Sequence, residues 1–456
     1  MKKQIYIIIA LGLAGWNGAS AQEAAGEIAR EAAGREWTLK QCIDYAVSHN
    51  VDIRQSEISA RQSEVEAHTA RWARLPNLNA SAGQGWNWGR TQTMVKNEET
   101  GVMTTEYVNA SSHGTNAGLN ASVPLFTGLQ IPHQYELSKL NLKAAVADLD
   151  KAKEDLSIQV TQAYLQVLFN QELHDVALGQ VELSRVQLDR LERLASLGKA
   201  SEAEVAESRA RLAVDETAAV QTLNDYRLAL LDLSQLIELP SPEGLQTVRP
   251  ATLGQLAPLT PPDEIYQSAL TGKPAIRAAQ YRLEGSRHSI RIAQSAFYPQ
   301  LSLNGSLSTN YYSSINRTFS QQLEDNFSKY LGLSLSIPLF NRFSTRNRVR
   351  AARLRQESYS LELEQAKKTL YKEIQQAWYN ATASESKLAG SRASAEASRE
   401  SFTLISRKYE NGKANAVEFD EAKQKLMKAR SDELQAKYDY LFRTKILDFY
   451  KGVPIE

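Results

Sequence analysis

The chain has 456 residues, of which 42% are hydrophobic and 23% are charged, and its formal net charge is +1. No apolar run reaches the roughly 18 residues of a membrane-spanning helix, which argues against a helix-bundle channel. The near-neutral charge provides no basic surface for wholesale nucleic-acid binding, so no nucleic-acid partner is expected.

The first 21 residues, 1–21, have the pattern of a secretory signal peptide. Lys2 and Lys3 precede an apolar run from 5 to 13, and the sequence ASA at 19–21 is an A-x-A cleavage site. We predict cleavage after Ala21, followed by a loosely ordered segment up to residue 36. Cys42 is the single cysteine and is not at the cleavage site, so the protein is not predicted to be a lipoprotein; a buried helix residue is expected instead.

The segment 22–237 predicts a helix, a strand hairpin and a hairpin of long helices. Helical periodicity extends from 39 to 74, and alternation of apolar with small polar residues predicts a β-hairpin over 77–125. A narrow apolar seam predicts a long helix hairpin over 132–237 that turns at Gly198. Its first helix, of about 66 residues, spans roughly 100 Å at 1.5 Å per residue.

The segment 263–451 predicts the same elements again. It follows a linker, 238–262, which holds six of the thirteen prolines. Its helix runs to 297 with a break at 272–274, its β-hairpin covers 300–339, and its long helix hairpin covers 345–450.

Matching landmarks indicate that the two segments are copies of one structural repeat. The sequence SVPLF at 122–126 returns as SIPLF at 336–340, an offset of 214, and GKA at 198–200 returns as GKA at 412–414. Upstream the offset is 223, which relates LPNL at 75–78 to YPQL at 298–301. The first copy therefore has nine additional residues within its β-hairpin.

The predicted strands carry Asn, Ser and Gly on one face and apolar residues on the other. The apolar face gains aromatic residues near its outer ends, which are candidate membrane-interface residues: Trp86, Trp88, Tyr311 and Tyr312. Outer-membrane barrels alternate in this way. The alternative is a soluble antiparallel sheet packed on helices. Since about eight strands are needed to close a barrel, four strands predict a barrel shared between chains.

The turns of the helix hairpins carry acidic residues with two open interpretations. Ser201 with Glu204 forms a capping box, and Asn415 with Glu418 resembles one. Glu207 and Glu421 lie one turn further along and are not explained by capping. The acids serve as caps alone, or they also form acidic rings where several chains meet at a narrow mouth.

Six arginines crowd the start of the second long helix and break the repeat: Arg342, Arg346, Arg348, Arg350, Arg353 and Arg355. The matching positions of the first copy supply Lys139 as their only base. Cations at a helix N-terminus oppose its dipole and need partners. Lipid phosphates, acids of a neighbouring chain and a solvated face are the alternatives.

No catalytic or cofactor-binding site is predicted. The six histidines form no H-E-x-x-H motif, and with a single cysteine in the chain they form no metal-binding combination of Cys and His. We therefore expect neither a metal, a cofactor nor an enzymatic activity.

The motifs taken together resemble those of the TolC-like outer-membrane efflux proteins, the outer membrane factors of tripartite efflux and type I secretion systems. The similarity covers about 38 to 451 and rests on the paired PNL and PQL starts, the paired PLF exits, and YENGKANAVEFDEAKQKL at the second helical turn. The resemblance implies a mainly α fold with β structure. Duplicated helix hairpins form an α-barrel tunnel, and four strands contribute to a transmembrane β-barrel shared by a homotrimer.

The resemblance also implies roles for residues at the turns. The family's inward acids fall on Glu418 and Glu421 and its gate tyrosine on Tyr409, whereas its arginine falls on Ala414. The turn motifs that contact a periplasmic adaptor fall on Leu197, Gly198 and Lys199 and on Asn411, Gly412 and Lys413.

The expected function is a passive outer-membrane export duct without catalysis of its own. The expected partners are outer-membrane lipid, a periplasmic adaptor and an inner-membrane pump of the RND or ABC type. The sequence specifies neither the exported substrate nor the pump. The alternative is a structural or adhesive coiled-coil protein of the outer-membrane surface.

Overall fold

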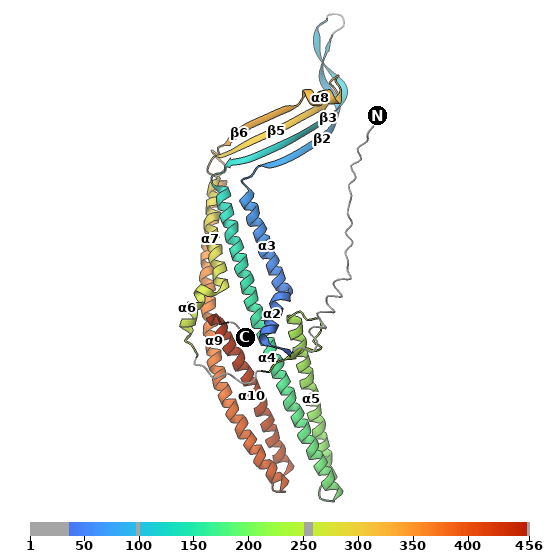
Figure 1. Cartoon of the computed structure of the whole chain (residues 1–456), viewed down its shortest axis with the longest axis vertical. Helices are drawn as coiled ribbons and strands as arrows, with labels where there is room; N and C mark the ends of the chain where they lie inside the picture. The colour runs from blue at the N-terminus through green and yellow to red at the C-terminus, as the bar shows by residue number, and fades with distance from the viewer. Residues whose placement is uncertain (1–35, 97–100, 250–258, 454–456) are drawn as a thin grey trace. The chain divides into compact units, whose positions relative to one another are not determined.

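The computed structural model describes residues 36–96, 101–249 and 259–453. Within these ranges the protein is mainly helical and contains one four-stranded sheet, which confirms the predicted fold class (Figure 1). The predicted signal peptide and residues 22–35 lie outside the described residues. Among the described helices, none has the length and apolar character needed to cross a membrane.

The elements follow one another in the same order in both halves, except that the second half has an additional short helix, α8, between its two strands. The first half contains β1 (Glu36–Trp37), α2 (Leu39–His49), α3 (Val51–Trp72), β2 (Asn77–Lys96), β3 (Met103–Phe126), α4 (Gln130–Ser196) and α5 (Glu202–Leu236). The second half contains β4 (Gln246–Thr247), α6 (Pro262–Gly272), α7 (Pro274–Ser295), β5 (Gln300–Tyr312), α8 (Phe319–Asp325), β6 (Ser328–Ser336), α9 (Ser344–Glu410) and α10 (Ala416–Lys451).

Both halves interrupt their first helix at matching positions. Lys273, inside the predicted break, separates α6 from α7, and Asn50, which is 223 residues earlier, separates α2 from α3. The Asn50 side-chain oxygen accepts hydrogen bonds from the backbone N–H groups of Asp52 and Ile53 at 2.9 and 3.3 Å, which caps α3. The single helix predicted over 39–74 is therefore wrong, because a side-chain cap starts a new helix inside it.

Two compact units divide the chain, and each takes segments from both halves. Unit 1 comprises the described residues up to 58, residues 147–277 and those from 366 onward; unit 2 comprises 59–146 and 278–365. Each compact unit therefore combines segments of the two sequence repeats.

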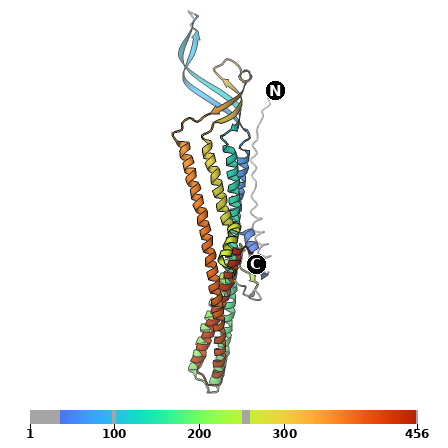
Figure 2. The ribbon, with the colours of Figure 1, turned by 90° about the vertical axis from the view of Figure 1, so that its left-hand side faces the viewer.

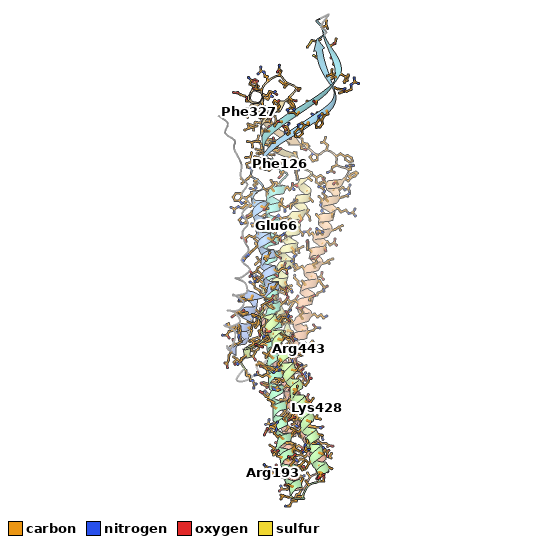
Figure 3. The ribbon with its side chains drawn as sticks, turned by 90° about the vertical axis from the view of Figure 1, so that its right-hand side faces the viewer. Glu66, Phe126, Arg193, Phe327, Lys428 and Arg443 are labelled. Atoms are coloured by element: carbon orange, nitrogen blue, oxygen red, sulfur yellow. The ribbon has the colours of Figure 1, made fainter. Side chains whose placement is uncertain are left out.

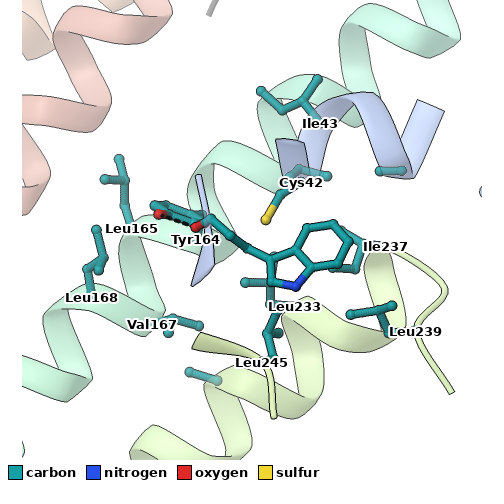
Figure 4. Packing of buried hydrophobic residues seen from close by; sticks show 14 of the residues in the cluster. Cys42, Ile43, Tyr164, Leu165, Val167, Leu168, Leu233, Ile237, Leu239 and Leu245 are labelled. Atoms are coloured by element: carbon teal, nitrogen blue, oxygen red, sulfur yellow. Dashed lines mark hydrogen bonds between the residues drawn. The ribbon is translucent and has the colours of Figure 1, made fainter. Parts of the chain in front are cut away.

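The main apolar core of unit 1 lies where α2 packs against α4 and α5 (Figure 4). Cys42 is fully buried there beside Ile43, as predicted, and burial raises the pKa of its thiol to about 12. The Tyr164 hydroxyl donates a hydrogen bond to the carbonyl oxygen of Trp37 or of Val248, each at 2.9 Å. The tyrosine thus anchors β1 and the chain after β4 to the long helix α4.

Also within unit 1, each long helix pairs with its return helix (Figure 1). The long helices α4 and α9 have 67 residues each, and α5 and α10 have 35 and 36. Leu388 of α9 is buried together with Ala436 and Tyr440 of α10. These apolar contacts correspond to the seam that predicted the hairpins.

Unit 2 contains the four-stranded antiparallel sheet, in the order β2-β3-β5-β6. The pairing of β2 with β3 runs from Asn77 opposite Ser122 to Lys96 opposite Met103, whereas β5 ends opposite Gly114. The outer part of the first hairpin is therefore two-stranded. In the described chain β2 and β6 each pair along one side, so the sheet has two open edges.

One face of this sheet exposes large apolar side chains. The register places Leu119 of β3 opposite Leu307 of β5, and Leu303 opposite Leu333 of β6, so their side chains share that face. Exposed apolar residues of this face include Leu78, Trp86, Trp88, Leu331, Leu333 and Leu335. An uncovered apolar face of this extent indicates an apolar environment or a partner surface.

The two PLF segments leave the sheet through the same backbone conformation. Gly128 and Leu129 follow the first segment with φ values of 63° and 66°, and Arg342 and Phe343 follow the second with 51° and 62°. Figure 3 shows Phe126, the last residue of β3 before the first of these junctions. Left-handed backbone costs residues other than glycine about 1 kcal/mol or more, so the repeated junction is specified by its surroundings.

The long helices of unit 2 either lead into a strand, as α3 and α7 do, or follow one, as α4 and α9 do. Parts of α4, α7 and α9 lie side by side in Figure 2. The short α8 between β5 and β6 was not predicted. It begins with a capping box at Thr318 and buries Gln322. The Gln322 amide contacts backbone groups of Tyr312, Ile315 and Arg317, which fixes the connection between the two strands.

Candidate functional site

The two turns between paired helices in unit 1 have the same hydrogen-bonded geometry. Gly198 and Gly412 adopt left-handed φ values of 70° and 68°. Lys199 N–H donates to the Leu194 carbonyl and Lys413 N–H to the Lys408 carbonyl, each at 2.8 Å. These bonds close a Schellman motif at the end of each long helix. The predicted adaptor-docking residues Leu197, Gly198 and Lys199 form the first turn, and Asn411, Gly412 and Lys413 form the second.

The caps that follow the turns use the predicted side chains. Ser201 Oγ accepts from Glu204 N–H at 3.2 Å, and the Glu204 carboxylate accepts from Ser201 N–H at 2.7 Å, which confirms the capping box. These hydrogen bonds, chiefly that from the Ser201 backbone, lower the pKa of Glu204. Asn415 Oδ1 accepts from Glu418 N–H at 2.8 Å, and Asn415 Nδ2 donates to the Glu418 carboxylate at 3.4 Å. Glu418 therefore belongs to the cap.

The two acids that capping does not explain each have a basic neighbour one turn away. Arg211 contacts Glu207 at 2.5 Å, and Lys425 lies 3.9 Å from Glu421. The Lys425 and Glu421 side chains are both largely exposed, so this pair contributes little to stability. The carboxylate of Glu421, near the start of α10, is thus accessible to solvent.

Tyr409 connects α9 to α4 and α10. Gln187 Nε2 donates to the Tyr409 hydroxyl at 2.7 Å, and the Tyr409 ring stacks on Phe419 with 4.9 Å between centroids. Burial is the main cause of the raised pKa of Tyr409. The Arg190 guanidinium lies 5.7 Å from the ring and donates to the Glu410 carbonyl at 3.0 Å. The position that corresponds to the family's arginine is Ala414 in this chain, which has no guanidinium. A guanidinium nevertheless lies beside Tyr409, and it is provided by Arg190 of α4.

A buried polar cluster of unit 1 joins α10 to α4 and α5. Lys423 Nζ donates to Ser184 Oγ at 2.5 Å and to the Asp215 carboxylate at 2.9 Å, and Ser184 also donates to Asp215. The Lys423 residue is 7% exposed. The ion pair joins α10 to α5, and removing either partner alone would leave the other charge buried without compensation.

Further ion pairs extend this connection along the helices. Arg211 of α5 forms an ion pair with Asp420 of α10. Lys437 contacts Glu172 of α4 at 2.8 Å, and the Tyr438 hydroxyl donates to the same carboxylate at 2.6 Å. Gln187, Arg190 and Lys423 were not predicted as site residues, because a polar residue on a long charged helix is normally solvated.

The sheet places the candidate membrane-interface aromatics in neighbouring rows. Trp86 pairs with His113, whose ring lies 5.8 Å from that of Tyr311, and Trp88 lies two residues further along β2. Tyr312 pairs with Gly114 and therefore points to the opposite face from Tyr311, since successive strand residues alternate. The prediction that Tyr312 belongs to the apolar face is wrong for that reason.

Among the described residues, no group of three or more His, Cys, Asp or Glu side chains is arranged to hold a metal ion. The chemical groups at the turns are thus the exposed carboxylates, the helix caps and the contacts between helices described above.

Long helix hairpins combined with strands that leave one apolar face exposed define the architecture of an outer-membrane channel subunit. A family model described as "Outer membrane efflux protein" matches residues 42–237 and 265–450. The chain belongs to this family, which confirms the resemblance to TolC-like proteins.

Curated relatives and solved structures agree with this assignment. The chain is 24% identical over 305 residues to the alkaline protease secretion protein AprF of Pseudomonas aeruginosa, which covers 66% of this chain and 62% of AprF. It is 24% identical over 429 residues to the outer membrane protein OprJ of the same species, which covers 89% and 83%. The match to AprF thus spans less than two thirds of that relative.

The solved structures of two channels share the fold. The outer-membrane channel OprN matches with a TM-score of 0.73 and 23% identity over 91% of this chain and 90% of its own. The CmeC outer membrane channel of Campylobacter jejuni matches with a TM-score of 0.75 and 18% identity over 91% and 85%.

A first expected result concerns Tyr409. Tyr409→Phe removes the hydrogen bond from Gln187, which contributes about 1 kcal/mol, so amide exchange of the α4 segment around Gln187 should accelerate about five-fold. Hydrogen exchange followed by mass spectrometry measures it. Tyr379→Phe, an exposed tyrosine on the same helix, is the matched control. Equal exchange in both variants would remove Tyr409 from the contact between helix pairs.

Proposed function

We propose that the protein is the passive outer-membrane duct of a tripartite efflux or secretion system, and that it has no catalytic activity. The observation that carries this proposal is the sheet of unit 2, which has an exposed apolar face and two open edges. Three such sheets joined edge to edge give twelve strands, enough to close a barrel without free edges. The family membership supports the same conclusion and favours it over a surface adhesin.

In this proposal the sheet crosses the outer membrane, and the helix hairpins continue the duct into the periplasm as an α-barrel tunnel. The aromatic residues Trp86, Trp88 and Tyr311 would contact the outer membrane interface, as aromatic girdles do. Tyr312, on the polar face, would line the lumen instead.

The mature chain would begin after Ala21 and carry no lipid anchor. Cys42 is buried inside α2, where no acyl chain could be attached, and this supports the absence of an anchor at the single cysteine. The relative SilC of Salmonella typhimurium is named a probable outer membrane lipoprotein, so this chain would differ from it.

The turns would receive a periplasmic adaptor, which links the duct to an inner-membrane pump of the RND or ABC type. Leu197, Gly198 and Lys199, and Asn411, Gly412 and Lys413, lie at the solvent-exposed ends of the helix pairs, which supports this role. The two turns share one Schellman geometry, so a trimer would offer six similar docking points.

Glu418 and Glu421 would act with Tyr409 as the periplasmic gate. Both carboxylates are exposed in the single chain, and the ion pair of Glu421 with Lys425 is solvent-exposed and weak, so three chains could bring the acids together as acidic rings.

Oligomeric state is the first test. The full-length protein purified in non-ionic detergent should have the mass of three chains, measured by native mass spectrometry. A stable monomer that inserts into membranes would contradict the shared barrel.

The gate makes a separate prediction. The double variant Glu418→Gln with Glu421→Gln should lose block by multivalent cations, because it removes two negative charges per chain from the mouth. Single-channel recording with a trivalent cation on the periplasmic side measures the block. Glu396→Gln with Glu400→Gln, an equal charge change on the exposed surface of α9, is the control. Unchanged block in the first variant excludes these acids from the gate.

A further inference from the structure

A groove at the start of α9 in unit 2 is lined by four arginines. It has a volume of about 930 Å³ and lies between the last turns of α7 and the first turns of α9. Arg291 comes from α7, and Arg346, Arg350 and Arg353 come from α9. None of the residues that line it carries a carboxylate. The groove is therefore strongly basic.

These arginines lack ionic partners within the described chain. None of the four guanidinium groups forms a hydrogen bond or an ion pair with another described residue, and all four residues are exposed. Arg346 also lies in the first turn of α9, where the helix dipole disfavours positive charge. An anion bound in the groove would relieve both unfavourable interactions.

The first repeat shows that the shared architecture does not require this charge. The positions that match the four arginines are His68, Pro132, Glu136 and Lys139. There the single lysine is paired, because Lys139 lies 3.0 Å from the Glu136 carboxylate. The basic groove is thus a property of the second repeat alone.

Apolar side chains border the arginines. Phe297, Tyr298 and Phe343 line the same groove and remain more than half exposed. The Phe343 ring packs edge-on against Phe340 of the second PLF segment, with 5.7 Å between centroids, and the adjacent Leu339 is 92% exposed. The groove therefore presents cationic and apolar surface side by side, which suits an amphipathic anion.

We propose that this groove binds the head group of an anionic glycerophospholipid. The guanidinium groups would hold the phosphate oxygens through paired N–H donors, and Phe297, Phe343 and Leu339 would contact the glycerol and acyl region. The inference rests on the proposed function, in which the start of β5 and the end of β6 lie at the inner surface of the outer membrane. Arginine clusters at such a surface attract anionic lipid through their positive charge.

A lipid-binding assay with two matched variants tests the proposal. Fluorescent phosphatidylglycerol is titrated into the full-length protein in non-ionic detergent. Arg346→Gln with Arg350→Gln should weaken its binding about ten-fold or more. Arg348→Gln with Arg355→Gln removes the same charge from positions of α9 outside the groove and should change the affinity less than about two-fold. Equal losses, or no loss, in the two variants overturn the proposal.

Two further arms identify the ligand. Unlabelled phosphatidylglycerol should displace the probe, whereas phosphatidylcholine and inorganic phosphate should displace it poorly. Displacement by inorganic phosphate as effective as that by the lipid would assign a free-phosphate site and overturn the lipid proposal. Loss of the trimer in the groove variant with unchanged lipid affinity would assign an acidic surface of a neighbouring chain, and this also overturns it.

Channel conductance of the wild-type protein, measured on the same preparation, separates this inference from the proposed function. Normal conductance with equal lipid affinity in both variants overturns the lipid inference alone. If the wild-type protein shows no conductance but the two variants still differ in lipid affinity, the result supports the lipid-binding groove and contradicts the proposed function as a duct.

Discussion

Lys423→Ala should loosen the end of the helix bundle more than any other single side-chain truncation at the turns. The substitution leaves Asp215 in a largely buried position without its cation, and breaking such a pair costs about 3 kcal/mol. Hydrogen exchange of the α10 segment around Lys423 and of the facing α4 segment should accelerate about 100-fold, because that free energy no longer opposes local opening.

The control for this prediction is Lys425→Ala, two residues away, where the lysine side chain is exposed and 3.9 Å from Glu421. It should leave exchange nearly unchanged. Lys423→Met combined with Asp215→Leu should recover much of the loss, since an apolar pair needs no partner charge. Similar exchange in the Lys423 and Lys425 variants would contradict the structural role of the buried pair.

Gly128→Ala should destabilise the junction between β3 and α4 by about 3 kcal/mol or more. A Cβ at Gly128 would lie 2.5 Å from the Ser295 carbonyl oxygen and 2.9 Å from Tyr298 Cβ, and the residue has a φ of 63°. The backbone would therefore have to move as well as adopt a strained conformation. The yield of folded trimer and its thermal unfolding temperature should both fall.

Gly198→Ala provides the matched control, because Gly198 has nearly the same φ, 70°, but no atom lies within 4 Å of the added Cβ. Only the left-handed conformation then costs energy, about 1 kcal/mol. If the two alanine variants unfold at the same temperature, close packing at the first PLF exit is not what requires Gly128.

The repeat, the long helices and the strand faces could be predicted because they depend on local periodicity. Both long helices end two residues before the glycines that mark the predicted turns, Gly198 and Gly412, and both strand hairpins follow their PNL and PQL starts. The capping box at Ser201 was also predictable, since it needs only two side chains three residues apart.

Other features depend on contacts between distant segments and left no local pattern. The break at Asn50 is stabilised by its side chain, which also donates to the Leu236 carbonyl 186 positions away. The sequence predicts Lys423 and Gln187 to be solvated helix residues. Their contacts with Ser184 and Tyr409 form only when distant helices pack together. The face of Tyr312, by contrast, could have been predicted locally, because Tyr312 follows Tyr311 directly and successive strand residues point to opposite faces.

The central claim is that three chains close one water-filled duct. Recording from planar lipid bilayers that contain the purified, trimeric, full-length protein tests this claim most directly. The account predicts discrete ion-conducting steps, with cation selectivity that weakens when Glu418 and Glu421 are both changed to glutamine. A trimer that demonstrably inserts into the bilayer but passes no current, even after the tip contacts are broken by Lys423→Ala, would contradict it.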